Sequence, residues 1–218
     1  MELKPQKYKL NLILSSLFFP LTTPDVFDSL RSRGFEVARP PGPIPVGPRV
    51  YLSGSIAKKH ECWIDIDHNR NLVGCEGVSL ENTIQTFSEL IAMLKDDFSI
   101  DLSKEVSYTE LTASLVVTSD QNPLLKLQRI SMDSKHAKEF GSVLGAPVAN
   151  YRLSIVPQGE FPSSKKWFEI DITPRLTPPT KAYWVEVVFR YDGIEETLAF
   201  TRALNSTVSS IINVIEKS

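Results

Sequence analysis

The chain has 218 residues, 42% of them hydrophobic and 23% charged, so it is long enough to bury a substantial core as one domain or two paired halves. Its formal net charge of −2 provides no overall field that attracts nucleic acid or an anionic membrane. Two cysteines are too few for a secreted disulfide scaffold, so we expect a reduced, cytoplasmic protein. No apolar run reaches the roughly 18 residues that predict a membrane span.

The first hundred residues predict a strand, a helix, three strands and a second helix. Asn11, Ser15 and Ser16 interrupt the apolar stretch near the N-terminus, so we expect a buried first strand there and not a secretory signal. The expected elements are a strand at residues 8–16, a helix from Thr23 to Gly34, strands at 50–57, 62–67 and 72–75, and a helix capped by Ser79 whose apolar face carries Ile84, Phe87, Ile91, Leu94 and Phe98.

A proline-rich segment, RPPGPIPVGP at residues 39–48, follows the first predicted helix. Five prolines in ten residues exclude a helix or an interior strand there, because proline lacks the backbone donor that both require. We expect a stiff surface connection, and the alternative is a peptide ligand for an aromatic groove.

The second hundred residues repeat the same order of elements. Asn122 and Pro123 open a helix with the cap-then-proline pattern of Thr23 and Pro24. The expected elements are a strand at 111–119, a helical region from Asn122 to about Gly145, strands at 151–156, 167–172 and 182–191, and a helix from about Glu195 whose apolar face carries Phe200, Leu204, Val208, Ile211 and Ile215.

Short matching segments in the two parts of the chain predict an internal duplication. LILSS at residues 12–16 corresponds to LVVTS at 115–119, and WIDID at 63–67 corresponds to WFEID at 167–171. The matches keep the same order at offsets from 99 residues, for Pro24 and Pro123, to 114 residues, for Glu81 and Glu195. The expected fold is therefore α+β. Two β-α-β3-α repeats, residues 1–104 and 105–218, pair into one curved antiparallel sheet with helices on one side.

This order of elements resembles the TATA-box-binding-protein-like fold, in which a duplicated unit forms one curved sheet with helices on its convex side. The resemblance covers most of the chain as an order of elements and includes no sequence motif. A second resemblance, to the helix-grip fold, is the alternative: there a sheet wraps a long C-terminal helix and encloses a ligand cavity.

Alternation along three predicted strands places every tryptophan on the same side as the acids. Successive side chains of a strand point to opposite faces, and an unpaired carboxylate is costly to bury, so the acids mark the face that helices leave uncovered. Because tryptophan is enriched at binding hot spots, this face is the candidate partner-binding surface. The alternative is that the indole rings pack half-exposed along the sheet without a binding role. The candidate residues are Trp63, Asp65, Asp67, Trp167, Glu169, Asp171, Trp184 and Glu186.

The acids count against two other roles for this surface. In the TATA-box-binding-protein-like fold the corresponding face docks onto the minor groove of DNA, but a row of carboxylates repels phosphate. The carboxylates also come in pairs, which hard cations favour as ligands, yet residues two apart on a strand lie about 7 Å apart and cannot share one ion unaided. We therefore expect no metal, and nucleic-acid binding is disfavoured.

The two cysteines flank a predicted turn at His68 and Asn69. A two-residue turn places Cys62 directly opposite Cys75, where a cross-strand disulfide forms under oxidation. A longer loop instead leaves two reduced, buried thiols.

The sequence contains no motif of a zinc protease, a phosphate-binding loop, a dinucleotide-binding fold or a serine hydrolase. It favours a non-enzymatic module without a cofactor, whose aromatic and acidic sheet face binds a protein partner or a second copy of itself. One alternative is a small-molecule binder or enzyme of helix-grip type, with a cavity beneath the C-terminal helix. Nucleic-acid binding is the least favoured alternative.

Overall fold

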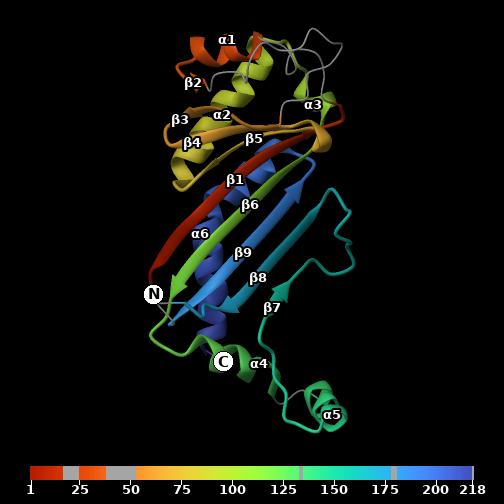
Figure 1. Cartoon of the computed structure of the whole chain (residues 1–218). Helices are drawn as coiled ribbons and strands as arrows, with labels where there is room; N and C mark the ends of the chain where they lie inside the picture. The colour runs from red at the N-terminus through yellow and green to blue at the C-terminus, as the bar shows by residue number, and fades with distance from the viewer. Residues whose placement is uncertain (17–24, 38–52, 133–134, 178–180, 218) are drawn as a thin grey trace.

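The computed structural model describes residues 1–16, 25–37, 53–132, 135–177 and 181–217, and these form one nine-stranded sheet with helices packed against it (Figure 1). The strands are β1 Leu3–Leu14, β2 Glu36–Val37, β3 Ser53–Lys59, β4 Cys62–Asp67, β5 Leu72–Gly77, β6 Val106–Thr118, β7 Leu153–Ile155, β8 Trp167–Pro174 and β9 Ala182–Tyr191. The helices are α1 Asp25–Ser32, α2 Leu80–Asp96, α3 Leu102–Glu105, α4 Pro123–Met132, α5 Lys135–Leu144 and α6 Ile194–Lys217.

The prediction of an α+β fold with one antiparallel sheet is confirmed. The strand order is β2-β3-β4-β5-β1-β6-β9-β8-β7, and each neighbouring pair is antiparallel. β4 and β9 have the predicted bounds, whereas β1 and β6 begin earlier than predicted. The proline-rich segment at 39–48, the helix cap at Thr23 and Pro24, and residues 50–52 of a predicted strand lie outside the described residues.

The pairing of β1 with β6 forms the centre of the sheet. Eleven residue pairs join the two strands, and Leu10 lies opposite Leu111 near the middle of the ladder. Going outward from β1 the sheet continues through β5, β4 and β3, and going outward from β6 it continues through β9, β8 and β7. The strands nearest the centre are therefore the first strand of each half of the chain.

The longest helices, α2 and α6, cover one face of the sheet. Tyr8 of β1 donates a hydrogen bond to Asn205 of α6 at 3.0 Å, and Cys75 of β5 donates one to the backbone oxygen of Thr83 in α2 at 3.4 Å. The side chains of Tyr8 and Cys75 point to the same face, because both strands alternate around the opposed pair Leu10 and Cys75. This face carries most of the core, including Leu10, Leu12, Ile64, Ile66, Val73, Leu111, Leu115, Ile172, Val185 and Val187.

Polar contacts fix both ends of the helical layer. Ser79 is the N-cap of α2, as predicted, and its hydroxyl accepts a hydrogen bond from the backbone N–H of Asn82. At the far end of α6, the Glu216 carboxylate accepts hydrogen bonds from Tyr183 and Ser119, and Lys126 of α4 donates to the Glu216 backbone oxygen at 2.6 Å. Burial and the neighbouring carboxylate raise the pKa of Tyr183 well above its ordinary value, so its hydroxyl remains a donor.

The buried faces of the two long helices are rotated slightly from the predicted ones. Ile84 and Ile91 are only half-buried, whereas Leu90 and Met93 are buried, and in α6 Ile212 is buried where Ile211 was predicted. Small polar residues explain the shift, because the buried faces also carry Thr83, Thr86, Thr197 and Thr201. The hydroxyl groups of Thr83 and Thr201 each donate a hydrogen bond to a backbone oxygen one helical turn earlier, so these polar groups have a partner although they are buried.

The turn between β4 and β5 is longer than two residues, so the cysteines do not face each other. A 3₁₀ turn at His68–Arg70 is followed by Asn71 at φ 50°, and Asp67 pairs with Leu72. Cys75 therefore lies opposite Ile64, not Cys62. Both thiols are buried and free, and burial raises the pKa of Cys75 well above its ordinary value.

Replacing Asp97 by Asn tests the ion pair between the segment after α1 and the end of α2. Hydrogen bonds from Arg33 and then Ser29 lower the pKa of Asp97 from 3.8 to about 2. A carboxyl group with a lowered folded pKa adds stability above its unfolded pKa and loses it as the pH falls through the folded value. We expect Asp97→Asn to lower the free energy of unfolding at pH 7 by about 0.5–1 kcal/mol, with the loss fading from pH 4 to pH 2.

Urea denaturation across this pH range measures the effect. Asp96→Asn is the matched control, because Asp96 lies 3.4 Å from the same guanidinium but its side chain is 67% exposed. If Asp97→Asn lowers the free energy of unfolding by the same amount at pH 2 and at pH 7, the ionised Asp97 carboxylate is not the source of the stability.

Candidate functional site: the open face of the sheet

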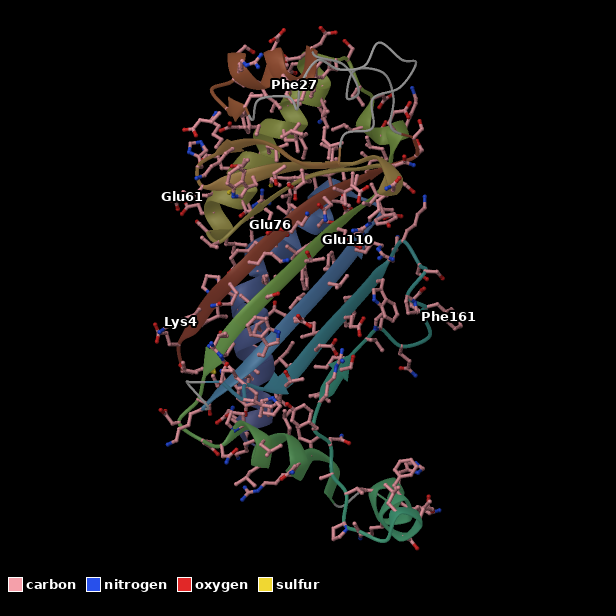
Figure 2. The ribbon with its side chains drawn as sticks, in the orientation of Figure 1. Lys4, Phe27, Glu61, Glu76, Glu110 and Phe161 are labelled. Carbon is pink, nitrogen blue, oxygen red and sulfur yellow. The ribbon has the colours of Figure 1, made fainter. Side chains whose placement is uncertain are left out.

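The face of the sheet opposite α2 and α6, called the open face here, carries all eight candidate residues. Figure 2 views the sheet from this side, with α6 behind it and Glu76 and Glu110 labelled on it. Trp63, Asp65 and Asp67 alternate with the buried Ile64 and Ile66 on β4. By the same alternation and the register of the strands, the face also presents Trp167, Glu169 and Asp171 of β8, and Trp184 and Glu186 of β9.

The three tryptophans differ in exposure although they share this face. Trp63 is 47% exposed, and the Lys58 ammonium lies 5.2 Å from its ring centre. Trp184 is half-buried, and Trp167 is only 7% exposed. Only Trp63 therefore offers a large part of its indole ring to a partner.

A buried ion pair lies next to Trp167. Arg190, directly opposite Trp167, donates to Glu110 through Nε at 3.2 Å and through Nη2 at 2.8 Å. Its Nη1 donates to the backbone oxygens of Pro162 and Ser164 at 2.8 and 3.3 Å. One guanidinium thus ties the β7–β8 connection to the open face beside Trp167, while Phe161 of this connection is 72% exposed (Figure 2).

The predicted acids are mostly engaged by neighbouring side chains. Lys9 lies 2.6 Å from Asp65 and 3.7 Å from Glu76, and the Ser55 hydroxyl donates to Asp65 at 2.6 Å. Burial alone raises the pKa of Asp171, but hydrogen bonds from Arg152 and Ser154 outweigh it and hold that pKa below its ordinary value. Two of the five predicted acids, Asp65 and Asp171, are thus held in ion pairs, and the Ser154 hydroxyl donates to Glu169 at 3.4 Å.

Sequence alternation places three cations, Lys9, Arg152 and Arg190, on this face, but it does not reveal the other basic residues. Lys4 and Lys7 fall in a stretch of β1 without hydrophobic alternation, and a register shift between Pro5 and Lys7 hides their phase. Lys58 and Glu110 also lie on this face. The cations of the face are Lys4, Lys7, Lys9, Lys58, Arg152 and Arg190, and its carboxylates are Asp65, Asp67, Glu76, Glu110, Glu169, Asp171 and Glu186.

The two pairs of predicted acids do not meet. β5, β1, β6 and β9 separate β4 from β8, and five strand spacings of about 4.8 Å place the pairs roughly 24 Å apart. Within the described part of the chain, no three His, Cys, Asp or Glu side chains form a cluster that could hold a metal ion.

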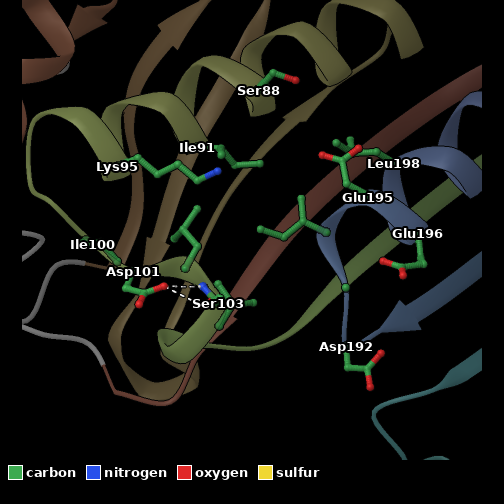
Figure 3. A pocket seen from close by; sticks show the side chains of 14 residues that line it. Ser88, Ile91, Lys95, Ile100, Asp101, Ser103, Asp192, Glu195, Glu196 and Leu198 are labelled. Atoms are coloured by element: carbon green, nitrogen blue, oxygen red, sulfur yellow. Dashed lines mark hydrogen bonds between the residues drawn. The ribbon is translucent and has the colours of Figure 1, made fainter.

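A pocket on the helical side of the molecule is a second feature, which sequence reasoning missed (Figure 3). It has a volume of about 830 Å³ and lies between the C-terminal half of α2, the α3 region and the first turn of α6. The pocket borders the start of α6, whereas further along this helix Leu204, Val208 and Ile212 are buried in the core. Val106, the first residue of β6, is the one lining residue that belongs to a strand.

Comparison with models of known protein families finds no match, and comparison with curated protein sequences also finds none. Of the helices in the described residues, none combines the length and apolarity needed to cross a membrane.

Replacing Arg190 by Met tests the buried ion pair. The Glu110 side chain is 6% exposed, and removal of its partner leaves a carboxylate that is expensive to bury. We expect Arg190→Met to lower the free energy of unfolding by roughly 2–4 kcal/mol in urea denaturation, and to make the β7–β8 connection more sensitive to proteolysis.

Arg70→Met is the matched control, because Arg70 lies 3.7 Å from the same carboxylate and is 58% exposed. We expect the control to change stability by less than about 1 kcal/mol. A second replacement, Glu110→Met in the Arg190→Met background, should recover much of the loss. Equal effects of Arg190→Met and Arg70→Met would refute the ion-pair argument.

Proposed function

We propose that this chain is a non-enzymatic binding module and that the half of its open face around β4 binds a protein partner. The single observation that carries the proposal is Trp63, a large aromatic side chain left 47% exposed on a face that no helix in the described residues covers. Tryptophan buries a large contact area at low entropic cost and is the commonest type of hot-spot residue. Lys58 and the paired charges around Asp65 supply the polar rim that typically surrounds such a residue.

The charge of the open face favours a protein over a nucleic acid. Its carboxylates slightly outnumber its cations, and Lys9 and Arg190 already hold carboxylates at 2.6 and 2.8 Å. A phosphate backbone needs free lysine and arginine side chains to displace its counterions. A mixed, paired surface suits a protein partner, for which charge pairs give specificity more than affinity.

We also infer that the sheet consists of two copies of one unit, residues 1–104 and 105–218, arranged as in the TATA-box-binding-protein-like fold. Three observations support this inference. β5, β4 and β3 follow β1 as β9, β8 and β7 follow β6, with β2 as an additional edge strand on one side. Leu10 and Leu111 face each other at the centre, and Trp63 and Trp167 occupy corresponding strands. When the two tryptophans are aligned, the strand register makes Lys9 correspond to Glu110 and Glu76 to Arg190. This register differs by two residues from the match of LILSS with LVVTS, under which Lys9 would correspond to Thr112.

Truncation of Trp63 tests the binding proposal. We expect Trp63→Ala to weaken binding of the partner at least 10-fold, because hot-spot residues contribute 2 kcal/mol or more. The partner is first captured with the wild-type protein, identified by mass spectrometry, purified and then titrated against each variant. Stability should change little, because the side chain is half exposed.

Val214→Ala is the matched control, because Val214 is 71% exposed on α6, outside the open face. We expect it to bind like the wild type. A purified partner that binds Trp63→Ala and the wild type equally well rules out the open face around β4 as its site. A shift of duplex DNA at low salt that Trp63→Ala abolishes favours nucleic acid instead.

A further inference from the structure

We propose that this protein also self-associates head to tail, with α5 of one copy bound in the pocket between α2, α3 and α6 of a second copy. This surface is separate from the open face, so the inference goes beyond the proposed function. Three features support it: an uncovered apolar helix, an apolar pocket of suitable size, and charges of opposite sign on the two.

The helix α5 has an apolar face that nothing in the described structure covers. Phe140, Val143 and Leu144 are 61%, 85% and 69% exposed, and no residue of α5 is buried. The spacing of three and four residues places the three side chains on one side of the helix. In Figure 1, α5 stands apart from the sheet at the end of an arm formed with α4, where Leu125 and Ile130 are also exposed.

The pocket carries apolar side chains that meet a docked helix face. Its walls include Ile91 of α2, Leu102 of α3 and Leu198 of α6, together with Ile100 and Ile194. Ile91 and Ile194 are half-buried and supply most of the accessible apolar surface, whereas the other three are buried. Its volume of about 830 Å³ accommodates two or three apolar side chains of a docked helix. Burial of each such side chain lowers the free energy of the complex, because apolar surface that is exposed on an isolated α5 is removed from water.

The charges around the pocket and on α5 are complementary. Four of the lining residues are acidic, Asp101, Asp192, Glu195 and Glu196, and one, Lys95, is basic (Figure 3). Lys104 lies 2.8 Å from Asp101 and Lys166 lies 3.5 Å from Asp192, so the excess of negative charge rests mainly on Glu195 and Glu196. By contrast, α5 begins with Lys135, His136 and Lys138 and contains one acid, Glu139. An acidic rim with an apolar floor thus faces a basic helix with an apolar face, the pattern that steers association and fixes its orientation.

The geometry of α6 makes the contact intermolecular. Lys126 of α4 binds the backbone oxygen of Glu216, at the C-terminal end of α6, whereas the pocket borders Ile194 at its N-terminal end. A helix of 24 residues is about 36 Å long, so α4 and α5 lie at one end of the molecule and the pocket at the other. A contact between two different surfaces forms open chains, or rings if the rotation closes.

Sedimentation velocity and light scattering on matched variants test the proposal. Phe140→Asp combined with Leu144→Asp disables the arm, and Ser88→Arg combined with Glu195→Lys obstructs the pocket through two exposed residues and reverses its charge. From roughly 5 to 500 μM, the range expected for a small interface, we expect the wild-type mass to rise above 24.5 kDa. Each variant alone should remain at 24.5 kDa or associate at least 10-fold more weakly.

A mixture of the two variants gives the decisive result. The arm variant keeps an intact pocket and the pocket variant keeps an intact arm, so we expect the mixture to form a 1:1 heterodimer and nothing larger. Trp63→Ala should associate like the wild type, which separates this inference from the proposed function. A wild-type protein that stays monomeric over the whole range overturns the proposal. Association that both variants retain also overturns it. A mixture that does not pair overturns it as well, and this is the result expected if α5 of one copy contacts α5 of another.

Discussion

The antiparallel pairing of β1 with β6 is the constraint on which the rest of the structure depends. These two long strands join the halves of the chain through eleven residue pairs. Their inward side chains, from Tyr8 to Leu14 and from Leu111 to Val117, form the middle of the core under both long helices. A shift of one residue in this ladder would turn those side chains toward the open face, so the apolar pattern holds the register strongly.

The same pairing determines what the open face can carry. Once Leu10 and Leu111 point toward the helices, Lys9 and Glu110 must point away from them, each beside a neighbouring strand that supplies an opposite charge. Lys9 meets Asp65 and Glu76, and Arg190 meets Glu110. Charges on a wide sheet lose part of their hydration to their neighbours, and pairing across strands offsets that cost.

Much of this fold could be predicted from sequence, because alternation and helix caps are local signals. The bounds of β4 and β9, the cap at Ser79 and the single antiparallel sheet all follow from such signals. The register between β4 and β5 could not, because it depends on a left-handed residue at Asn71 that lengthens the turn. A propensity for turns identifies the place of such a loop but not its length.

The candidate site shows the same boundary between local and long-range information. Trp63 and Trp167 occupy like positions in matching sequences, so local patterns assign both the same environment. Their exposures, 47% and 7%, differ although their sequences match, because Arg190 of β9 holds the β7–β8 connection beside Trp167. The pocket beside α6 was missed for a related reason, since its walls come from three elements whose sequences carry no common signal.

In the duplication that we propose, residues of opposite charge lie beside the two tryptophans, Glu76 opposite Trp63 and Arg190 opposite Trp167. Arg190 has five N–H donors, so after binding Glu110 it still donates to the oxygens of Pro162 and Ser164 and holds the β7–β8 connection beside Trp167. Glu76, which lies opposite Trp63, is an acceptor and cannot hold backbone oxygens in this way. The connections also differ in length: only His60 and Glu61 join β3 to β4, whereas residues 156–166 join β7 to β8. The segment that Arg190 holds beside Trp167 therefore has no counterpart beside Trp63, and it is the accessible half around Trp63 that we assign to the partner.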